Sequence, residues 1–87
     1  GTLFPYTTLF RSLAIEAYDR QGLLRDVTAL FANARINVLA INTLSNKNTH
    51  TATMRLTVEI SDLGSLAKLL ERLNRLKNVI SAARLDR

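Results

Sequence analysis

Hydrophobic and polar residues alternate along four stretches of this chain. The clearest alternation covers residues 50–60 and predicts an antiparallel strand with one buried face. Its expected inward positions are Ala52, Met54, Leu56, Val58 and Ile60. Its expected outward positions are Thr51, Thr53, Arg55, Thr57 and Glu59. Shorter strand patterns cover residues 13–18, 36–44 and 79–85.

Two other stretches repeat their apolar residues every three or four positions, as one face of a helix requires. The first helical face comprises Leu23, Val27, Leu30, Phe31 and Ala34. The second comprises Leu63, Leu66, Leu69, Leu70, Leu73 and Leu76. Gly22 lies where the chain must turn into the first helix, and glycine adopts left-handed backbone angles without steric cost. Asp62, in preference to Ser61, is the expected N-cap of the second helix, and Asn78 is expected to end it.

These elements follow the order βαββαβ. Right-handed crossover connections then give an α+β, ferredoxin-like sandwich. We expect a four-stranded antiparallel sheet of order 4-1-3-2 with both helices on one face. The second strand should lie at a sheet edge, beside the first helix. Both faces of this strand carry apolar side chains, which favours pairing with another copy of the chain. These side chains belong to Val38, Leu39, Ala40 and Ile41.

The composition indicates one small globular domain. The 87 residues are 47% hydrophobic, which is enough for a single core. No apolar run reaches the roughly 18 residues of a membrane span, so we expect no membrane association. The absence of cysteine excludes disulfides and thiolate metal sites and favours a cytosolic location. The net charge of +5 is a modest excess.

The N-terminal segment differs in character from the rest of the chain. Residues 2–12 resemble the translation of a common sequencing adapter over their whole length; the alternative is an ordinary apolar extension. They lack the basic start and the cleavage site of a secretory signal. We therefore predict a non-native extension over residues 1–12 and a natural domain over residues 13–87. Without Arg11 the net charge is one unit lower.

The turn before the first helix offers a docking point for a ligand. The first amide N–H groups of that helix, near Leu23, Leu24 and Arg25, have no partner inside the helix. They lie at the positive end of the helix dipole. A carboxylate or carbonyl group can therefore bind there.

Three features of the chain resemble a known family. The element order, the Asp-x-x-Gly-Leu turn at residues 19–23 and the Ile-Asn-Val start of the second strand resemble the ACT domain, a regulatory module that often binds amino acids. Residues 17–28 and 78–84 resemble more closely the C-terminal ACT domain of long RelA/SpoT-type enzymes. Those enzymes make the stringent-response alarmone (p)ppGpp, and bifunctional members also hydrolyse it. The resemblance covers residues 13–87.

The resemblance implies a regulatory domain of a cytosolic bacterial GTP diphosphokinase whose catalytic domains lie upstream. A ligand, self-association or ribosome contact would then control those distant domains. The ribosome is a candidate partner because ACT domains of this type are associated with the ribosome-bound enzyme. Many amino-acid-binding ACT domains carry proline before the turn glycine, where this chain has Gln21.

We place a small amino acid at the junction of a homodimer formed through the second strand and the first helix. Its carboxylate or carbonyl binds the N–H groups near Gly22 and Leu23. Its ammonium lies near Asp19, and the Asn37 amide completes the polar contacts. The predicted site comprises Asp19, Gln21, Gly22, Leu23, Leu24, Asn37 and Val38. The alternative is that Asp19 and Asn37 only satisfy their own turn and strand end.

The residues that catalysis requires are not found together in this sequence. His50, the only histidine, falls beside a polar turn and is far more typical of a surface strand residue than of a catalytic base. Asp26 falls early in the first helix, where its charge favours the helix dipole. The chain carries no phosphate-binding loop, dinucleotide fingerprint or metal-ligand spacing. We predict that this fragment is not an enzyme and binds no cofactor and no metal.

Basic residues recur along the second helix. Lys68, Arg72 and Arg75 fall on one face and Lys77 follows just beyond. A solvated outer face opposite the leucine stripe explains them, and so does phosphate contact with ribosomal RNA. Aromatic residues do not interleave with these charges, which disfavours stacking on single-stranded RNA.

Two other functions remain open. The chain could be a stand-alone ACT protein that senses amino acids. It could also be an RNA-binding module of ferredoxin-like fold, but the expected outer face of the third strand, residues 50–60, offers no aromatic platform for bases.

Overall fold

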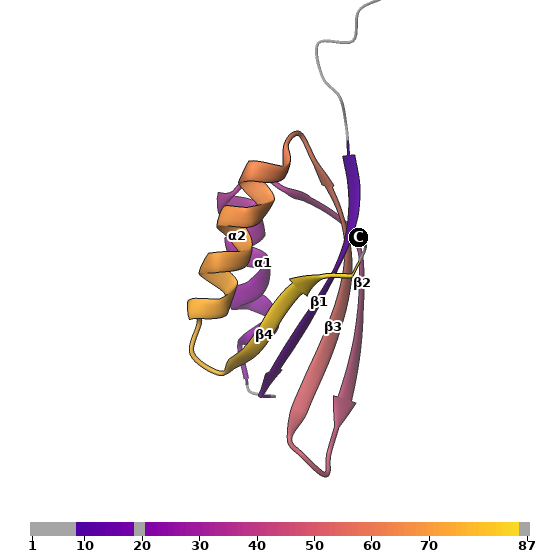
Figure 1. Ribbon diagram of the computed structural model, residues 1–87. Helices are drawn as coiled ribbons and strands as arrows, with labels where there is room; N and C mark the ends of the chain where they lie inside the picture. Colours follow the sequence, from indigo (N-terminus) through magenta and orange to yellow (C-terminus); the bar gives the residue numbers. More distant parts are fainter. Residues whose placement is uncertain (1–8, 19–20, 86–87) are drawn as a thin grey trace, which may run out of the picture.

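The computed structural model describes residues 9–18 and 21–85. Its elements are β1 (Leu9–Tyr18), α1 (Leu23–Asn33), β2 (Asn37–Asn46), β3 (Thr51–Ile60), α2 (Leu63–Arg75) and β4 (Val79–Arg84). Both helices cover one face of the sheet, and the other face is open (Figure 1).

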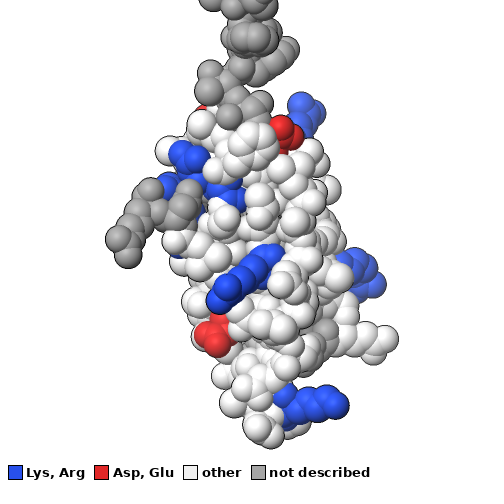
Figure 2. Space-filling view, turned by 90° about the vertical axis from the view of Figure 1, so that its right-hand side faces the viewer, with Lys and Arg blue, Asp and Glu red and all other residues white. Residues whose placement is uncertain are grey.

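The sheet confirms the predicted ferredoxin-like topology. Its strand order is β2-β3-β1-β4, and each neighbouring pair is antiparallel. β2 and β4 are therefore the two edge strands. Figure 2 shows the open face of the sheet, on which charged side chains are few and scattered.

β1 begins at Leu9 and not at residue 13, where the natural domain was predicted to start. Leu9 lies opposite Ile60 and packs against the core, so the inward alternation of this strand continues toward the N-terminus. Arg11 lies opposite Val58 and is half-buried. The non-native origin of residues 1–12 stays a prediction.

The core lies between the helices and the inner face of the sheet. All five predicted inward positions of β3 are buried, the most exposed being Ile60 at 3%. The predicted helix faces are confirmed for most positions. Buried helical residues are Leu23, Val27 and Phe31 on α1, and Leu66, Leu69 and Leu73 on α2. Leu63 at the start of α2 is the exception, since its side chain is 41% exposed.

The two helices begin differently. Gly22 precedes α1 with φ 85°, the left-handed conformation predicted for it, and contributes no side-chain cap. Asp62 precedes α2 and accepts a 2.8 Å hydrogen bond from the Ser65 amide, as predicted. That bond, together with one from the Ser65 hydroxyl, lowers the pKa of the Asp62 carboxyl below its ordinary value of 3.8.

α2 ends at Arg75, before the predicted end at Asn78. Leu76 is already extended, with ψ 141°, so the helix cannot continue through it. Asn78 adopts a left-handed conformation with φ 75° in the turn that leads to β4. Its carbonyl accepts a 2.7 Å hydrogen bond from the Tyr18 amide, which joins this turn to the end of β1.

The side chain of Asn74 occupies part of the outer edge of β4. Its amide nitrogen donates to the Ala82 carbonyl at 3.1 Å, and its amide oxygen accepts from the Ala82 N–H at 3.0 Å. The same nitrogen donates to the Leu70 carbonyl at 2.9 Å, which fixes the side chain on α2. The two backbone groups that Ala82 would offer to another strand are therefore already bonded.

β2 is the other edge strand and, like β4, is exposed along most of its length. Only Val38 is half-buried, and the other residues of the strand are exposed. A bulge at Leu39 shifts the register between Val38 and Ala40. The helices leave the outer part of β2 uncovered (Figure 1). β2 is therefore the edge at which a further strand can add.

Candidate ligand-binding site

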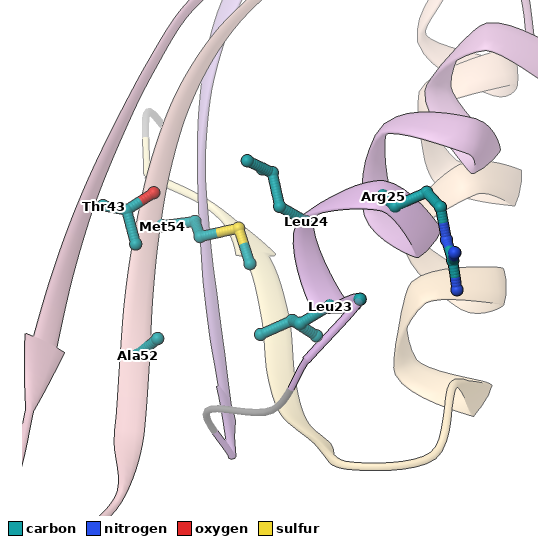
Figure 3. A pocket seen from close by; sticks show the side chains of 7 residues that line it. Leu23, Leu24, Arg25, Thr43, Ala52 and Met54 are labelled. Atoms are coloured by element: carbon teal, nitrogen blue, oxygen red, sulfur yellow. The ribbon is translucent and has the colours of Figure 1, made fainter.

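A cavity of about 370 Å³ opens between the start of α1 and the sheet. Its lining residues are Gly22, Leu23, Leu24, Arg25, Thr43, Ala52 and Met54. In Figure 3 the side chains of Leu23 and Leu24 point from α1 toward Met54 on β3. The Arg25 side chain points away from the centre of the cavity. The interior is therefore mainly apolar, with volume typical of a small-molecule site.

The strand register explains the floor of this cavity. Met54 pairs with Thr43 across β2 and β3, and directly opposed residues in an antiparallel pair share one face. Ala52 lies two residues before Met54 and so projects to the same face. Ala52 and Met54 are buried, whereas Thr43 is exposed at the open side of the cavity. Thr43 thus brings a hydroxyl group to the rim of an apolar floor.

The start of α1 supplies the polar part of the site. The first bond within the helix runs from the Asp26 amide to the Gly22 carbonyl, at 3.0 Å. The amides of Leu23, Leu24 and Arg25 precede that bond and have no partner inside the helix. Gly22 has no side chain that could cap or cover these amides. A carboxylate beside them would also lie at the positive end of the helix dipole.

Two oppositely charged residues of the described chain lie in the first turn of the helix. Arg25 and Asp26 approach to 3.7 Å, and the Arg25 side chain is 83% exposed. An exposed pair of this kind contributes little to stability. Among the described residues, the amides at the start of α1 are groups to which an anionic ligand could bind.

The structure brings three of the predicted ligand-binding residues together, namely Gly22, Leu23 and Leu24. Gln21 is exposed in the preceding turn and is not among the lining residues. Asp19 lies outside the described residues.

Asn37 and Val38 lie at the other end of the sheet from this cavity within the same chain. Asn37 is opposite Glu59, five residues along β3 from Met54, or about 17 Å at the rise of a strand. The Asn37 amide donates to the Glu59 carboxylate at 3.1 Å. This bond joins β2 to β3, and the predicted role of Asn37 in ligand binding stays a prediction.

Sequence reasoning did not identify Thr43, Ala52 and Met54 as part of the site. The alternation of residues 50–60 places Ala52 and Met54 on the inward face, but every inward residue of that strand looks alike in sequence. Which of them borders an opening depends on how far α1 extends over the sheet. That position follows from tertiary packing and has no local sequence signal.

Other predicted features have these positions. His50 is exposed in the turn between β2 and β3. The predicted basic residues Lys68, Arg72, Arg75 and Lys77 are all exposed. Within the described part of the chain, His, Cys, Asp and Glu side chains do not gather in threes as metal ligands would. Over the same residues, none of the helices has the length and apolar character needed to cross a membrane.

The sequence of this chain is similar to part of known GTP pyrophosphokinases. It is 42% identical over 71 residues to a GTP pyrophosphokinase of Escherichia coli (strain K12). It is 40% identical over 74 residues to the GTP pyrophosphokinase of Haemophilus influenzae. These alignments cover 82% and 85% of the chain but only 10% of each relative. The chain thus spans about a tenth of the length of these curated relatives.

Solved structures show the same fold. The ACT domain from the GTP pyrophosphokinase of Chlorobium tepidum superposes with a TM-score of 0.78 at 20% identity, covering 91% of this chain and all of that one. The small subunit of acetolactate synthase from Thermotoga maritima gives 0.77 at 17% identity, with 90% of this chain and 48% of that chain covered. The family model described as the ACT domain matches residues 10–84. The chain therefore belongs to the ACT domain family.

Proposed function

We propose that this ACT domain regulates a longer GTP pyrophosphokinase by binding a small apolar amino acid at a site that a second copy of the domain completes. The observation that carries the proposal is the apolar cavity at the start of α1, where Gly22 contributes no side-chain cap, beside the open edge of β2. An alternative is a stand-alone ACT protein that senses the same ligand without controlling an enzyme.

The parent activity rests on the sequence relationship. The identity of about two in five residues extends over nearly all of the domain, and the relatives in question are named GTP pyrophosphokinase. Such enzymes make (p)ppGpp in the stringent response. In a parent of this kind the domain would bias the catalytic domains through a ligand whose affinity differs between two states of the enzyme.

The cavity suits an amino acid with an apolar side chain. The first amides of α1, which have no partner inside the helix, would bind the carboxylate, and the space between Leu24 and Met54 would receive the side chain. An apolar group there would displace water from an apolar surface, which is favourable. A charged side chain would lose its hydration among the same residues and would bind poorly.

The second copy would complete the polar contacts. If two β2 strands pair antiparallel about Ile41, Thr43 of one copy lies opposite Leu39 of the other, and Asn37 lies opposite Ser45, two residues along the strand from Thr43. Asn37 and Val38 of the second copy would then reach the cavity that they cannot reach within their own chain. The pairing would also cover three exposed side chains, Leu39, Ile41 and Leu44, which are 50%, 38% and 65% exposed. β4 is a poorer edge for this purpose because Asn74 already bonds to Ala82.

Calorimetry tests the ligand site directly. Valine, leucine and methionine are expected to release or absorb heat on binding to the domain at millimolar concentration, and aspartate and lysine are not. Leu24→Asp should abolish that signal because it places a carboxylate beside the amides. Leu63→Asp is the matched control, since Leu63 is also exposed in the first turn of a helix but lies away from the cavity. Absence of heat with all five amino acids would exclude the proposed ligand class.

Sedimentation equilibrium tests the second copy. Ile41→Lys should shift the domain toward monomer by placing a charge at the centre of the β2 pairing. Ile80→Lys, at a 45% exposed position on β4, should leave the association unchanged. An equal effect of both substitutions, or a domain that is monomeric at every concentration, would contradict pairing through β2.

Ribosome contact through Lys68, Arg72, Arg75 and Lys77 is a second candidate function, supported by the exposure of all four side chains. Basic residues of this kind would contact RNA phosphates with salt-dependent affinity. Reversing the three charges on α2 in the full-length enzyme should weaken its association with ribosomes, whereas Arg55→Glu on β3 should not. Unchanged association across a salt series would leave the four residues as a solvated face.

A further inference from the structure

A second cavity, of about 190 Å³, lies between the end of α1 and the middle of α2. We call it the interhelical notch; its lining residues are Asn33, Ala34, Ser65, Lys68, Leu69 and Arg72. Buried Leu69 is the one lining residue with almost no exposed surface, and the polar side chains stand around it. The interhelical notch is separate from the amino-acid cavity, with which it shares no lining residue.

From this geometry we infer that the interhelical notch binds the diphosphate group of a small molecule. Lys68 and Arg72 are four residues apart on α2, so their side chains leave the same face of the helix and stand one turn apart. Lysine offers a compact positive charge, and arginine offers a planar fork that matches two phosphate oxygens. Two adjacent phosphate groups therefore find one cation each.

Of the uncharged residues in the interhelical notch, Asn33 offers a hydrogen bond to a ligand, whereas the Ser65 hydroxyl is already engaged. Asn33 is exposed at its rim and brings an amide that can donate to a phosphate oxygen. The Ser65 hydroxyl already donates to the Asp62 carboxylate at 3.1 Å, which holds that carboxylate at the helix start. The volume lies below the range of sites that enclose a whole drug-sized ligand. The interhelical notch therefore holds the diphosphate, and the remainder of the molecule stays outside.

The charges nearby are unequally distributed. The pKa of Asp62 is lowered mainly by hydrogen bonds from Ser65, and the positive charge of Lys68 contributes least, so Asp62 balances Lys68 only slightly. Arg72 lies one turn further from Asp62, and no hydrogen bond or ion pair involves it among the described residues. Arg75 and Lys77 do not line the cavity. Arg72 is thus the cation on which the affinity for a diphosphate depends most.

Inorganic pyrophosphate is the probe for this site, followed by amide chemical shifts of the whole 87-residue chain. Pyrophosphate should cause saturable shifts at Ser65, Lys68 and Leu69 and bind about tenfold more tightly than sulfate, which carries a single tetrahedral group. The double substitution Lys68→Gln and Arg72→Gln should weaken binding about tenfold or more. The matched control, Arg75→Gln with Lys77→Gln, removes the same charge at and just beyond the C-terminal end of α2 and should leave affinity within about twofold.

Three results would overturn the inference. Shifts that grow without saturation at every basic residue would indicate ordinary ion screening. Equal losses in the two double variants would indicate a diffuse positive field. Binding of an RNA duplex through all four cations, with no saturable response to pyrophosphate, would assign the surface to nucleic acid. Failure of this test leaves the amino-acid cavity untouched, because the two sites share no residue.

Discussion

Replacing Asn74 tests the claim that one edge of the sheet is protected. Asn74→Ala removes both hydrogen bonds to Ala82 and the bond to the Leu70 carbonyl. Ala82 is 7% exposed, so its N–H and carbonyl are poorly placed to recover both bonds from water. The same substitution removes the obstacle to strand addition at β4.

The expected loss of stability follows from these contacts. Two net hydrogen bonds to Ala82 contribute about 2 kcal/mol, since a typical intramolecular bond contributes about 1 kcal/mol. Alanine has the higher helix propensity and returns roughly 0.5 kcal/mol. The free energy of unfolding should therefore fall by about 1.5 kcal/mol, which in a domain of this size lowers the melting temperature by roughly 6–12 °C.

Thermal and urea unfolding, followed by circular dichroism, measure this change. Glu71→Ala is the control because Glu71 is exposed on the same helix and should change the melting temperature little. Asn74→Asp preserves the size of the side chain and one acceptor, but its second oxygen faces the Ala82 carbonyl, so it should not restore stability. If Asn74→Ala and the control have equal melting temperatures, the hydrogen bonds between Asn74 and Ala82 do not stabilise the domain. If Asn74→Asp is as stable as the unchanged protein, the side chain acts only through packing.

Three further predictions concern local conformation. Gly22→Ala should lower the free energy of unfolding by about 1 kcal/mol in chemical denaturation because φ is 85°, and Gly22→Asn should cost less. Asp62→Asn should retain the helix cap but lose the charge. Because folding lowers the pKa of Asp62, its charged form stabilises the protein above pH 3.8. This stabilisation disappears as pH falls through the pKa of the folded protein. The difference in stability between the two proteins should therefore shrink on acidification, and a constant difference would contradict it. Arg11→Leu should raise the free energy of unfolding by about 1 kcal/mol, and the melting temperature with it, because Arg11 is half-buried opposite Val58. A lower melting temperature would contradict an inward position of this side chain.

The sequence predicts the fold well because its local and global signals agree. Alternation in residues 50–60 and the leucine spacing of the second helix each allow one kind of element. The cap at Asp62 follows from side-chain chemistry within one turn. Handedness of the crossovers then leaves few sheet orders to choose from.

Features that depend on packing between distant segments were not predictable in this way. Asn74 has the sequence context of an ordinary exposed helix residue, and only the position of β4 gives its amide a partner. The bulge at Leu39 likewise depends on how β2 meets β3. Thr43 belongs to the cavity because of its register with Met54, which a single strand does not encode.

The topology of the fold also separates two parts of the predicted site. α1 begins beside the end of β1 and carries the chain back along the sheet, so β2 must start at the opposite end. Eleven helical residues correspond to about 16 Å, too far for Asn37 to reach the cavity of its own chain. A site that contains both Gly22 and Asn37 therefore has to be shared between two copies.

Sharing of this kind predicts complementation between two inactive variants. Leu24→Asp destroys the cavity in both sites of a homodimer, and Asn37→Ala removes the donated amide from both. In a mixed dimer, one site combines the two defects and the other combines normal Leu24 from one chain with normal Asn37 from the other. After unfolding and refolding the variants together, calorimetry should recover binding at about a quarter of the sites, because half of the dimers are mixed if copies pair at random. Glu59→Ala controls for the Asn37–Glu59 bond, since it breaks that bond and keeps the amide. If the refolded mixture binds no more ligand than the two variants do separately, Asn37 does not contribute to the site of the other copy. Pairing through β2 is then not needed for ligand binding.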